Sequence, residues 1–151
     1  MGAGREVRPF GFAQGMLFPV GEFTLQPTRP DLERLIQSVD AVHGVIHCWS
    51  LDTPEMVDSL EEASIRGCGS TLYLLQALLQ EYSAPPSLWL VSRGTQAVVN
   101  ENEEAMPGLA QSPLWGMGQV IALEHPELQI VQVDLDPGAE GVAADAQMLF
   151  E

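Results

Sequence analysis

The sequence has 151 residues and a formal net charge of −15, with 21 Asp and Glu against 6 Lys and Arg. This length suits one domain that buries a hydrophobic core without disulfide bonds. The acidity disfavours nucleic acid and anionic membranes as partners, because both carry negative charge.

The two cysteines, Cys48 and Cys68, do not form the dense disulfide framework of small secreted proteins. We therefore expect two buried, reduced thiols. Neither a signal peptide nor an apolar run long enough to cross a bilayer is recognisable, which indicates a cytoplasmic protein.

The N-terminal part shows little regular pattern. Residues 1–14 are rich in glycine without a sustained period, which predicts a flexible or vector-derived stretch before one domain over residues 15–151. Residues 15–25 predict short extended pieces at a sheet edge, broken at Pro19. Apolar residues at helical spacing then predict a short helix over residues 31–39.

The middle of the chain alternates between strand and helix patterns. Residues 43–51 predict a buried strand, and residues 53–82 predict a long helix. Gly67 and Gly69 within this helix each lower helix propensity by about 1 kcal/mol relative to alanine, which predicts a close approach to a strand or partner helix. The next strand is predicted over residues 87–92.

Residues 112–137 contain a helix start, a buried helix, a stop and a buried strand. Ser112 is expected to cap the helix, with Pro113 in its first turn. The helix is apolar almost all round, which predicts burial on more than one side until Pro126 ends it. The run 128–135 predicts an interior strand of a parallel sheet, and the residues after it predict another helix.

The predicted order is strand, helix, strand, exposed loop over residues 96–111, helix, strand and helix. This alternation predicts an α/β fold in which a Rossmann-like parallel sheet carries helices on both faces.

Three stretches together carry a family resemblance: CWSLD at residues 48–52, LWLVSRGTQAV at 88–98 and LWGMGQVIALEHP at 114–126. They closely resemble the structural subdomain of modular polyketide synthase ketoreductases, over roughly residues 21–151. The resemblance implies a truncated Rossmann-like half of the short-chain dehydrogenase type. In that family a second half binds NADPH and reduces, so the expected partner is this catalytic half or an adjacent reductive domain of the same megasynthase.

A dinucleotide site requires a glycine-rich turn between a strand and a helix, because only glycine lets backbone amides reach the pyrophosphate. The chain offers three closely spaced glycine pairs: Gly2 and Gly4, Gly67 and Gly69, and Gly116 and Gly118. The first pair follows no predicted strand, and the other two lie within predicted helices, where close packing is the expected role. We therefore predict no cofactor and no cofactor-binding residue.

A short-chain reductase also needs a tyrosine with a lysine four residues later, because one helical turn brings the ammonium beside the phenol. The chain has no lysine, and neither Tyr73 nor Tyr82 has a basic residue at that spacing. Trp115 and Gln119 stand where the resemblance would place the pair. Ser92, at a predicted strand end, is then expected to be a loop hydroxyl bonded to the backbone, and we predict no catalytic residue.

The remaining candidates concern metal ions. His43 and His47 are expected on one face of a strand with Cys48 on the other, and two histidines fall short of a zinc site. We expect core or interface histidines. Asp134 and Asp136 flank a strand end where carboxylates could hold Mg²⁺, but helix capping by Asp136 is favoured. No metal site is predicted.

Three functions remain compatible with these patterns. The favoured one is a noncatalytic structural subdomain, not itself an enzyme. The alternatives are one part of a complete NADPH-dependent β-ketoacyl ketoreductase whose catalytic half lies outside these residues, and a small-molecule-binding Rossmann-like module. Trp49, Trp89 and Trp115 are expected in the core or an interface, and an apolar patch should stay exposed where a partner domain would pack.

Overall fold

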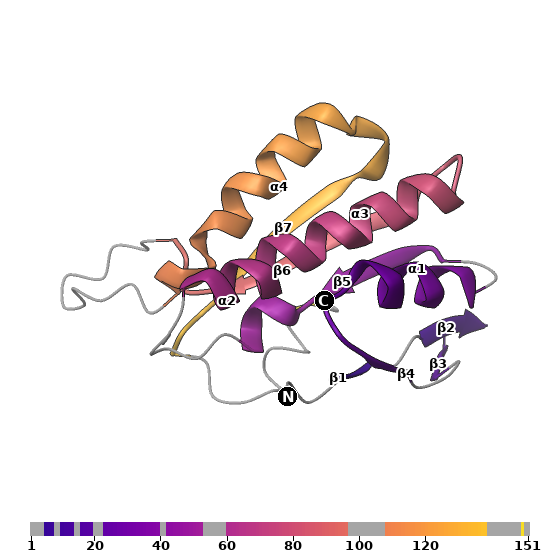
Figure 1. Cartoon of the computed structure of the whole chain (residues 1–151), viewed down its shortest axis with the longest axis horizontal. Helices are drawn as coiled ribbons and strands as arrows, with labels where there is room; N and C mark the ends of the chain where they lie inside the picture. The colour runs from indigo at the N-terminus through magenta and orange to yellow at the C-terminus, as the bar shows by residue number, and fades with distance from the viewer. Residues whose placement is uncertain are drawn as a thin grey trace.

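The computed structural model describes residues 5–7, 10–13, 16–19, 23–39, 42–52, 60–96, 108–138 and 149 (Figure 1). The strands are β1 (Arg5–Val7), β2 (Phe10–Ala13), β3 (Met16–Pro19), β4 (Phe23–Leu25), β5 (Gly44–His47), β6 (Ser87–Arg93) and β7 (Ile130–Leu135). The α-helices are α1 (Arg29–Gln37), α2 (Leu60–Ser64), α3 (Ser70–Glu81) and α4 (Ser112–Glu124). The other helical segments are η1 (Trp49–Asp52), the π-helical turn η2 (Ile65–Gly69), η3 (Leu109–Gln111) and η4 (Pro126–Leu128).

The central sheet consists of three parallel strands in the order β5-β6-β7. His47 pairs with Leu90, and Leu90 pairs in turn with Gln132. Among the described strands β6 is central and β7 lies at an edge, so the interior position predicted for β7 belongs to β6.

The hydrophobic core lies between the sheet and helices α1, α3 and α4. Leu88 and Leu90 of β6 are 0% and 2% exposed and share one cluster with leucines and isoleucines of all three helices. Residues of α3 and α4 both pack with Leu88 and Leu90, so the two helices cover the same side of the sheet. Figure 1 shows α3 in front of the strands and α4 alongside β7. This placement follows from topology, because right-handed crossovers between strands in sequential order put both connecting helices on one face.

The predicted α/β class with a Rossmann-like parallel sheet is confirmed. The predicted cover of both faces by helices stays a prediction, because α3 and α4 lie on one face and the further helix predicted from Asp136 onward lies outside the described residues.

The N-terminal strands pair antiparallel, β1 with β4 and β2 with β3. β3 and β4 correspond to the extended pieces predicted within residues 15–25. β1 and β2 lie within residues 1–14, where the sequence pattern predicts no regular element. Part of this pairing joins residues that lie ten or more positions apart in the sequence, and a short-range pattern does not reveal such partners.

β5 is shorter than the strand predicted over residues 43–51. It ends at His47 because the chain turns into η1, with the Leu51 amide donating to the Cys48 carbonyl at 3.1 Å. Ser50 is fully buried and donates to the carbonyl of Val91. This contact holds the turn against β6 in place of continued strand pairing.

The long helix predicted over residues 53–82 is divided into α2, the π-helical turn and α3, and residues 53–59 lie outside the described part. The close approach predicted at Gly67 and Gly69 is wrong. A Cβ at Gly67 would meet no atom within 4 Å, and one at Gly69 would lie 3.8 Å from the Ser64 carbonyl. At these residues the chain widens into a π-helical turn, and Thr71 Oγ1 donates to the Gly67 carbonyl at 2.8 Å.

The start of α4 also differs from the prediction. Ser112 is the first helical residue rather than the cap, and its hydroxyl donates to the Leu109 carbonyl at 2.7 Å. The reason is that η3 runs directly into α4, so no extended residue precedes the helix. Pro113 does occupy the first turn, and the helix ends before Pro126 as predicted.

The glycine pair of α4 divides into one close contact and one open position. A Cβ at Gly118 would lie 2.5 Å from Nε2 of Gln132, which confirms close packing against β7. A Cβ at Gly116 would meet nothing within 4 Å, so the same prediction is wrong there.

Candidate functional site

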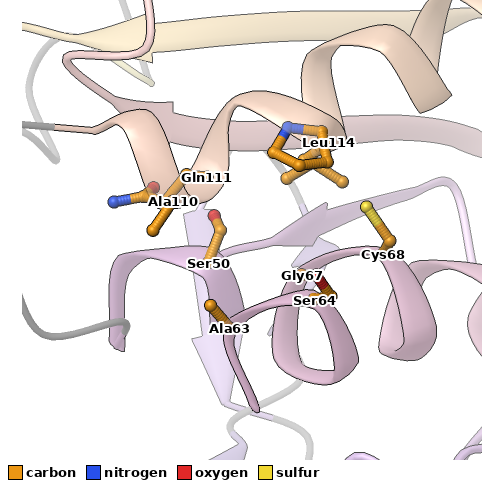
Figure 2. A pocket seen from close by; sticks show the side chains of 9 residues that line it. Ser50, Ala63, Ser64, Gly67, Cys68, Ala110, Gln111 and Leu114 are labelled. Atoms are coloured by element: carbon orange, nitrogen blue, oxygen red, sulfur yellow. The ribbon is translucent and has the colours of Figure 1, made fainter. Parts of the chain in front are cut away.

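The carboxyl ends of β5 and β6 form the edge at which Rossmann-like sheets bind ligands. A hollow at this edge is lined by Ser50 of η1, Gly67 and Cys68 of the π-helical turn, and Gln111 and Leu114 near the start of α4 (Figure 2). It is shallow and open to solvent, and it has almost no interior space even for a water molecule. Ligand pockets usually hold about 300–1,000 Å³, so this hollow is small for a dinucleotide.

The order of the described strands does not create a crevice beside this hollow. Ligands in doubly wound sheets bind where the strand order reverses and neighbouring connections diverge. β5, β6 and β7 follow one another without such a reversal. The described strands therefore lack the switch point that opens a nucleotide site.

Ser92 and Asp134 meet at the ends of β6 and β7. Ser92 is 2% exposed, and its Oγ donates to Asp134 Oδ1 at 2.7 Å. Asp134 also accepts from the Thr95 amide at 2.9 Å, from Thr95 Oγ1 at 2.9 Å and from the Gln96 amide at 2.9 Å. Ser92 therefore lies in β6 rather than in a loop, and its shortest bond goes to a carboxylate, while the backbone acceptor, the Val133 carbonyl, is farther away at 3.4 Å.

Sequence reasoning did not find the role of Asp134. The only sequence signal is a Ser and a Thr three residues apart at the end of one strand and an aspartate at the end of the next. Because both ends lie at one sheet edge, the carboxylate holds the loop after β6. Its oxygens are engaged by protein donors, which argues against the Mg²⁺ role considered above.

The same edge is closed by two glycines. Gly94 has a φ of 62°, and its amide donates to the Leu135 carbonyl at 3.1 Å. The Gly108 amide donates to the Gly94 carbonyl at 3.1 Å. Both ends of the predicted loop are therefore held beside β7, while residues 97–107 lie outside the described part.

His47 is a core histidine, as predicted. It is 5% exposed, its Nε2 lies 2.7 Å from Ser70 Oγ, and its ring makes an edge-on contact with Trp49 at 5.7 Å between centroids. Burial lowers the pKa of His47 from 6.5 to about 4. His43 is exposed and precedes β5, so the expectation that both histidines share a strand face is wrong.

Tyr82 lies away from the ligand-binding edge. Tyr82 follows the last turn of α3, at the amino-terminal end of the sheet, and its hydroxyl donates to the Val39 carbonyl at 3.3 Å. Tyr73 is half-buried against the core. Trp115 and Gln119 do lie one turn apart on α4, with Trp115 half-buried and Gln119 exposed.

Asp136 and the cysteines have plain structural surroundings. Asp136 Oδ1 accepts from the Gly138 amide at 2.7 Å, the type of bond that a helix cap makes, but the predicted helix lies beyond the described residues. Cys48 and Cys68 form no disulfide bond and are half-buried rather than buried as expected, and burial raises the pKa of Cys68. Within residues 23–39, 42–52, 60–96 and 108–138, no cluster of metal-ligating side chains occurs.

The outer face of α4 carries exposed apolar side chains and no charge. Leu123 is 84% exposed and Val120 is 51% exposed, and Gly116 and Gln119 lie exposed on the same helix. Glu124, the last residue, is the one charged residue of α4, in a chain of which 18% is charged. We call Gly116, Gln119, Val120 and Leu123 the α4 outer face. An exposed leucine next to an exposed valine on a helix face without charge is typical of a surface that packs against another protein or domain.

No helix in the described part of the chain combines the length and apolar character that crossing a bilayer requires.

Comparison with known proteins identifies the relatives of this chain. Residues 11–150 match the family model described as "Polyketide synthase extender module SpnB, Rossmann fold domain". The chain is 34% identical over 112 residues to polyketide synthase GfsB of Streptomyces halstedii, covering 73% of this chain. It is 44% identical over 80 residues to the pikromycin polyketide synthase component PikAII of Streptomyces venezuelae, covering 53% of this chain. The matches span about 2% of the length of either synthase.

A solved structure supports the fold. The chain superimposes on a short-chain dehydrogenase/reductase from Vibrio parahaemolyticus with a TM-score of 0.57, at 12% identity, covering 82% of this chain and 64% of that one. At this identity the likeness concerns the fold alone. The family match over residues 11–150 shows that the chain belongs to the Rossmann fold domain family of polyketide synthase extender modules.

Proposed function

We propose that the chain is a noncatalytic structural subdomain of a polyketide synthase ketoreductase, and that it supports a catalytic reductase half or an adjacent reductive domain of the same synthase. The observation that carries the proposal is the state of Ser92. At the strand end where a reductase hydroxyl would act, this side chain is 2% exposed and donates its proton to Asp134. It is therefore not free to bind a substrate carbonyl.

The residues of α4 support the same proposal. Trp115 and Gln119 occupy the spacing of the expected acid pair, and neither side chain can act as a tyrosine beside a lysine does. The α4 outer face gives the proposed partner a surface to cover, since Leu123 is 84% exposed. Burying an exposed leucine contributes about 1.5–3 kcal/mol, which favours association with an apolar partner.

The first experiment titrates NADPH into the chain by isothermal calorimetry, with an intact short-chain reductase as the positive control. We expect no saturable heat from the chain under conditions in which the reductase binds. Saturable binding at micromolar NADPH would overturn the noncatalytic assignment, because it would require a nucleotide site. Saturable binding of a polyketide-like small molecule instead would favour the alternative binding module.

The second experiment concerns the partner. The chain is coproduced with the reductase domain encoded in the same open reading frame and purified through a tag on that domain. Leu123→Glu should reduce copurification, while the unfolding free energy of the chain alone changes by less than about 0.5 kcal/mol, as for most surface substitutions.

Leu60→Glu on α2 is the matched control, because Leu60 is 71% exposed and lies on a different helix. Unchanged copurification of Leu123→Glu would exclude the α4 outer face as the contact. Absence of copurification with the unsubstituted chain would contradict the supporting role itself.

A further inference from the structure

The buried ring of His47 meets the hydroxyl of Ser70 where β5 ends and the π-helical turn passes into α3. We infer that His47 is locked as the neutral tautomer with its proton on Nε2, that this N–H holds Ser70 and the π-helical turn Ile65–Gly69 in place, and that acid releases the contact. The inference does not depend on the proposed function.

The direction of the proton follows from the other contacts of Ser70. Its Oγ lies 3.2 Å from the Gly67 carbonyl and also donates to the Arg66 carbonyl. A carbonyl oxygen can only accept, so the single hydroxyl proton of Ser70 is directed at these two oxygens. The Oγ lone pairs are left for His47 Nε2 at 2.7 Å, which must then carry a proton. Ser70 is fully buried, so no solvent competes for these bonds.

The other ring nitrogen of His47 is left as a bare acceptor. A neutral imidazole carries one N–H, and the contact with Ser70 uses it. Nδ1 is buried and has no hydrogen-bond partner among the described residues. Protonation would place a charge on this nitrogen inside the core, which is the reason that burial lowers the pKa of His47. The charged ring keeps its Nε2–H, so acid breaks the contact with Ser70 by favouring states in which the ring leaves the core for water.

The elements around the ring provide no counter-charge bonded to it. β6 places Leu90 opposite His47, and η1 places Trp49 against the ring and ends in Asp52. From α2 and the π-helical turn, Glu62 and Arg66 pair with each other at 2.7 Å near the surface. Cys68 of the same turn is half-buried, and burial raises its pKa, so it remains a neutral thiol.

The contact between His47 and Ser70 therefore helps to fix the conformation of the π-helical turn. This turn carries Ile65, which is 48% exposed, and it lines the hollow of Figure 2 through Gly67 and Cys68. Loss of the contact frees the Arg66 and Gly67 carbonyls from their fixed donor. The apolar surface at Ile65 and the wall of the hollow would then change together in acid.

The tautomer is measured directly by long-range ¹H–¹⁵N correlation spectra of the full chain at pH 7.5. We expect the Nε2-protonated pattern for His47, with Nδ1 at the shift of an unprotonated nitrogen. A Nδ1-protonated ring, or rapid exchange between tautomers, would overturn the inference. This result does not depend on any variant being able to fold.

Two substitutions test the roles of the two ring nitrogens separately. In His47→Gln the side-chain nitrogen can reach the position of Nε2. In His47→Asn the side chain is shorter, so its nitrogen falls near the position of Nδ1. Hydrogen exchange of residues 65–71 should be close to wild type in His47→Gln and about tenfold faster in His47→Asn and in Ser70→Ala, as expected for loss of a bond of about 1.4 kcal/mol. Equal hydrogen-exchange rates in His47→Gln and His47→Asn would contradict the inference that the Nε2–H of His47 holds Ser70 in place.

The acid response has its own control. After correction for the intrinsic pH dependence of exchange, wild-type residues 65–71 should exchange about tenfold faster or more at pH 5 than at pH 7, since protonation opposes the buried state. His47→Gln should lack this increase. An increase of the same size in His47→Gln would show that another group is responsible.

Discussion

The side-chain amide of Gln132 on β7 donates a hydrogen bond to the backbone carbonyl of Trp115 on α4 at 2.8 Å. It passes through the space that a side chain at Gly118 would fill. The spacing of Gly116 and Gly118 suggests a phosphate-binding turn, but the contact shows a different use. Gly118 lets a polar side chain of the sheet reach the helix backbone, and this fixes α4 against β7.

The two glycines of α4 should respond oppositely to alanine. Gly116→Ala should stabilise the chain by about 0.5–1 kcal/mol, because the Cβ enters open space and helix propensity improves. Gly118→Ala should destabilise it by about 1 kcal/mol, because the Cβ displaces Gln132 and breaks its bond to Trp115. Urea unfolding measures both. Equal stabilisation by the two substitutions would contradict this account, and in a Gln132→Ala background the penalty at Gly118 should shrink.

Gly108→Ala should be more damaging than either. A Cβ there would lie 2.0 Å from the Arg93 carbonyl oxygen and 2.6 Å from the carbonyl carbon of Gly94. These are backbone atoms of the closed sheet edge and cannot rotate away, so we expect a loss of more than about 2 kcal/mol in unfolding free energy. Gly116→Ala serves as the control. A tolerant surface site would lose less than about 1 kcal/mol of unfolding free energy. A loss that small would show that residues 93–94 and 108 are not in contact.

Asp134→Asn should destabilise the chain more than Ser92→Ala. The amide replaces one accepting oxygen by an NH₂ group that faces the amides of Thr95 or Gln96, which costs about 2 kcal/mol. Ser92→Ala removes one donor to the carboxylate and costs about 1 kcal/mol. Chemical unfolding at pH 7 compares them. Equal losses would show that the carboxylate does not organise the loop after β6.

Acid should weaken the folded state through His47. The unfolded chain takes up a proton near pH 6.5, but the folded chain does so only near pH 4. Between these values the unfolded state binds more protons, so the unfolding free energy falls as the pH falls, by about 3 kcal/mol across the window.

Unfolding in urea at pH 7 and at pH 4.5, for wild type and His47→Gln, checks this expectation. Carboxylates with lowered pKa values, such as Asp31, also lose stability as the pH falls, and the comparison removes their contribution because both proteins contain them. The wild type should lose more than the variant. An equal loss would assign the acid sensitivity to the carboxylates.

The sequence pattern predicts the elements whose signal is local. The apolar run of β6 and the continuous apolar helices α3 and α4 appear close to the predicted residues, because periodicity reflects burial against a common core. The predictions that fail depend on neighbours from elsewhere in the chain. Ser112 is a good cap residue on local grounds, but η3 leads straight into the helix, and a Cβ at Gly67 would meet no neighbouring atom, which the sequence pattern does not reveal.

The candidate site shows the same division. The absence of lysine and the identities of Trp115 and Gln119 are properties of the sequence, and they alone argue against a short-chain reductase acid pair. The pairing of Ser92 with Asp134, 42 residues apart, and of His47 with Ser70, 23 residues apart, arises only when β6 adjoins β7 and α3 covers β5. The residue types present and their spacing along the chain are determined by the sequence itself. Hydrogen-bond partners at a sheet edge are chosen by strand order and register, which depend on the burial of the whole core.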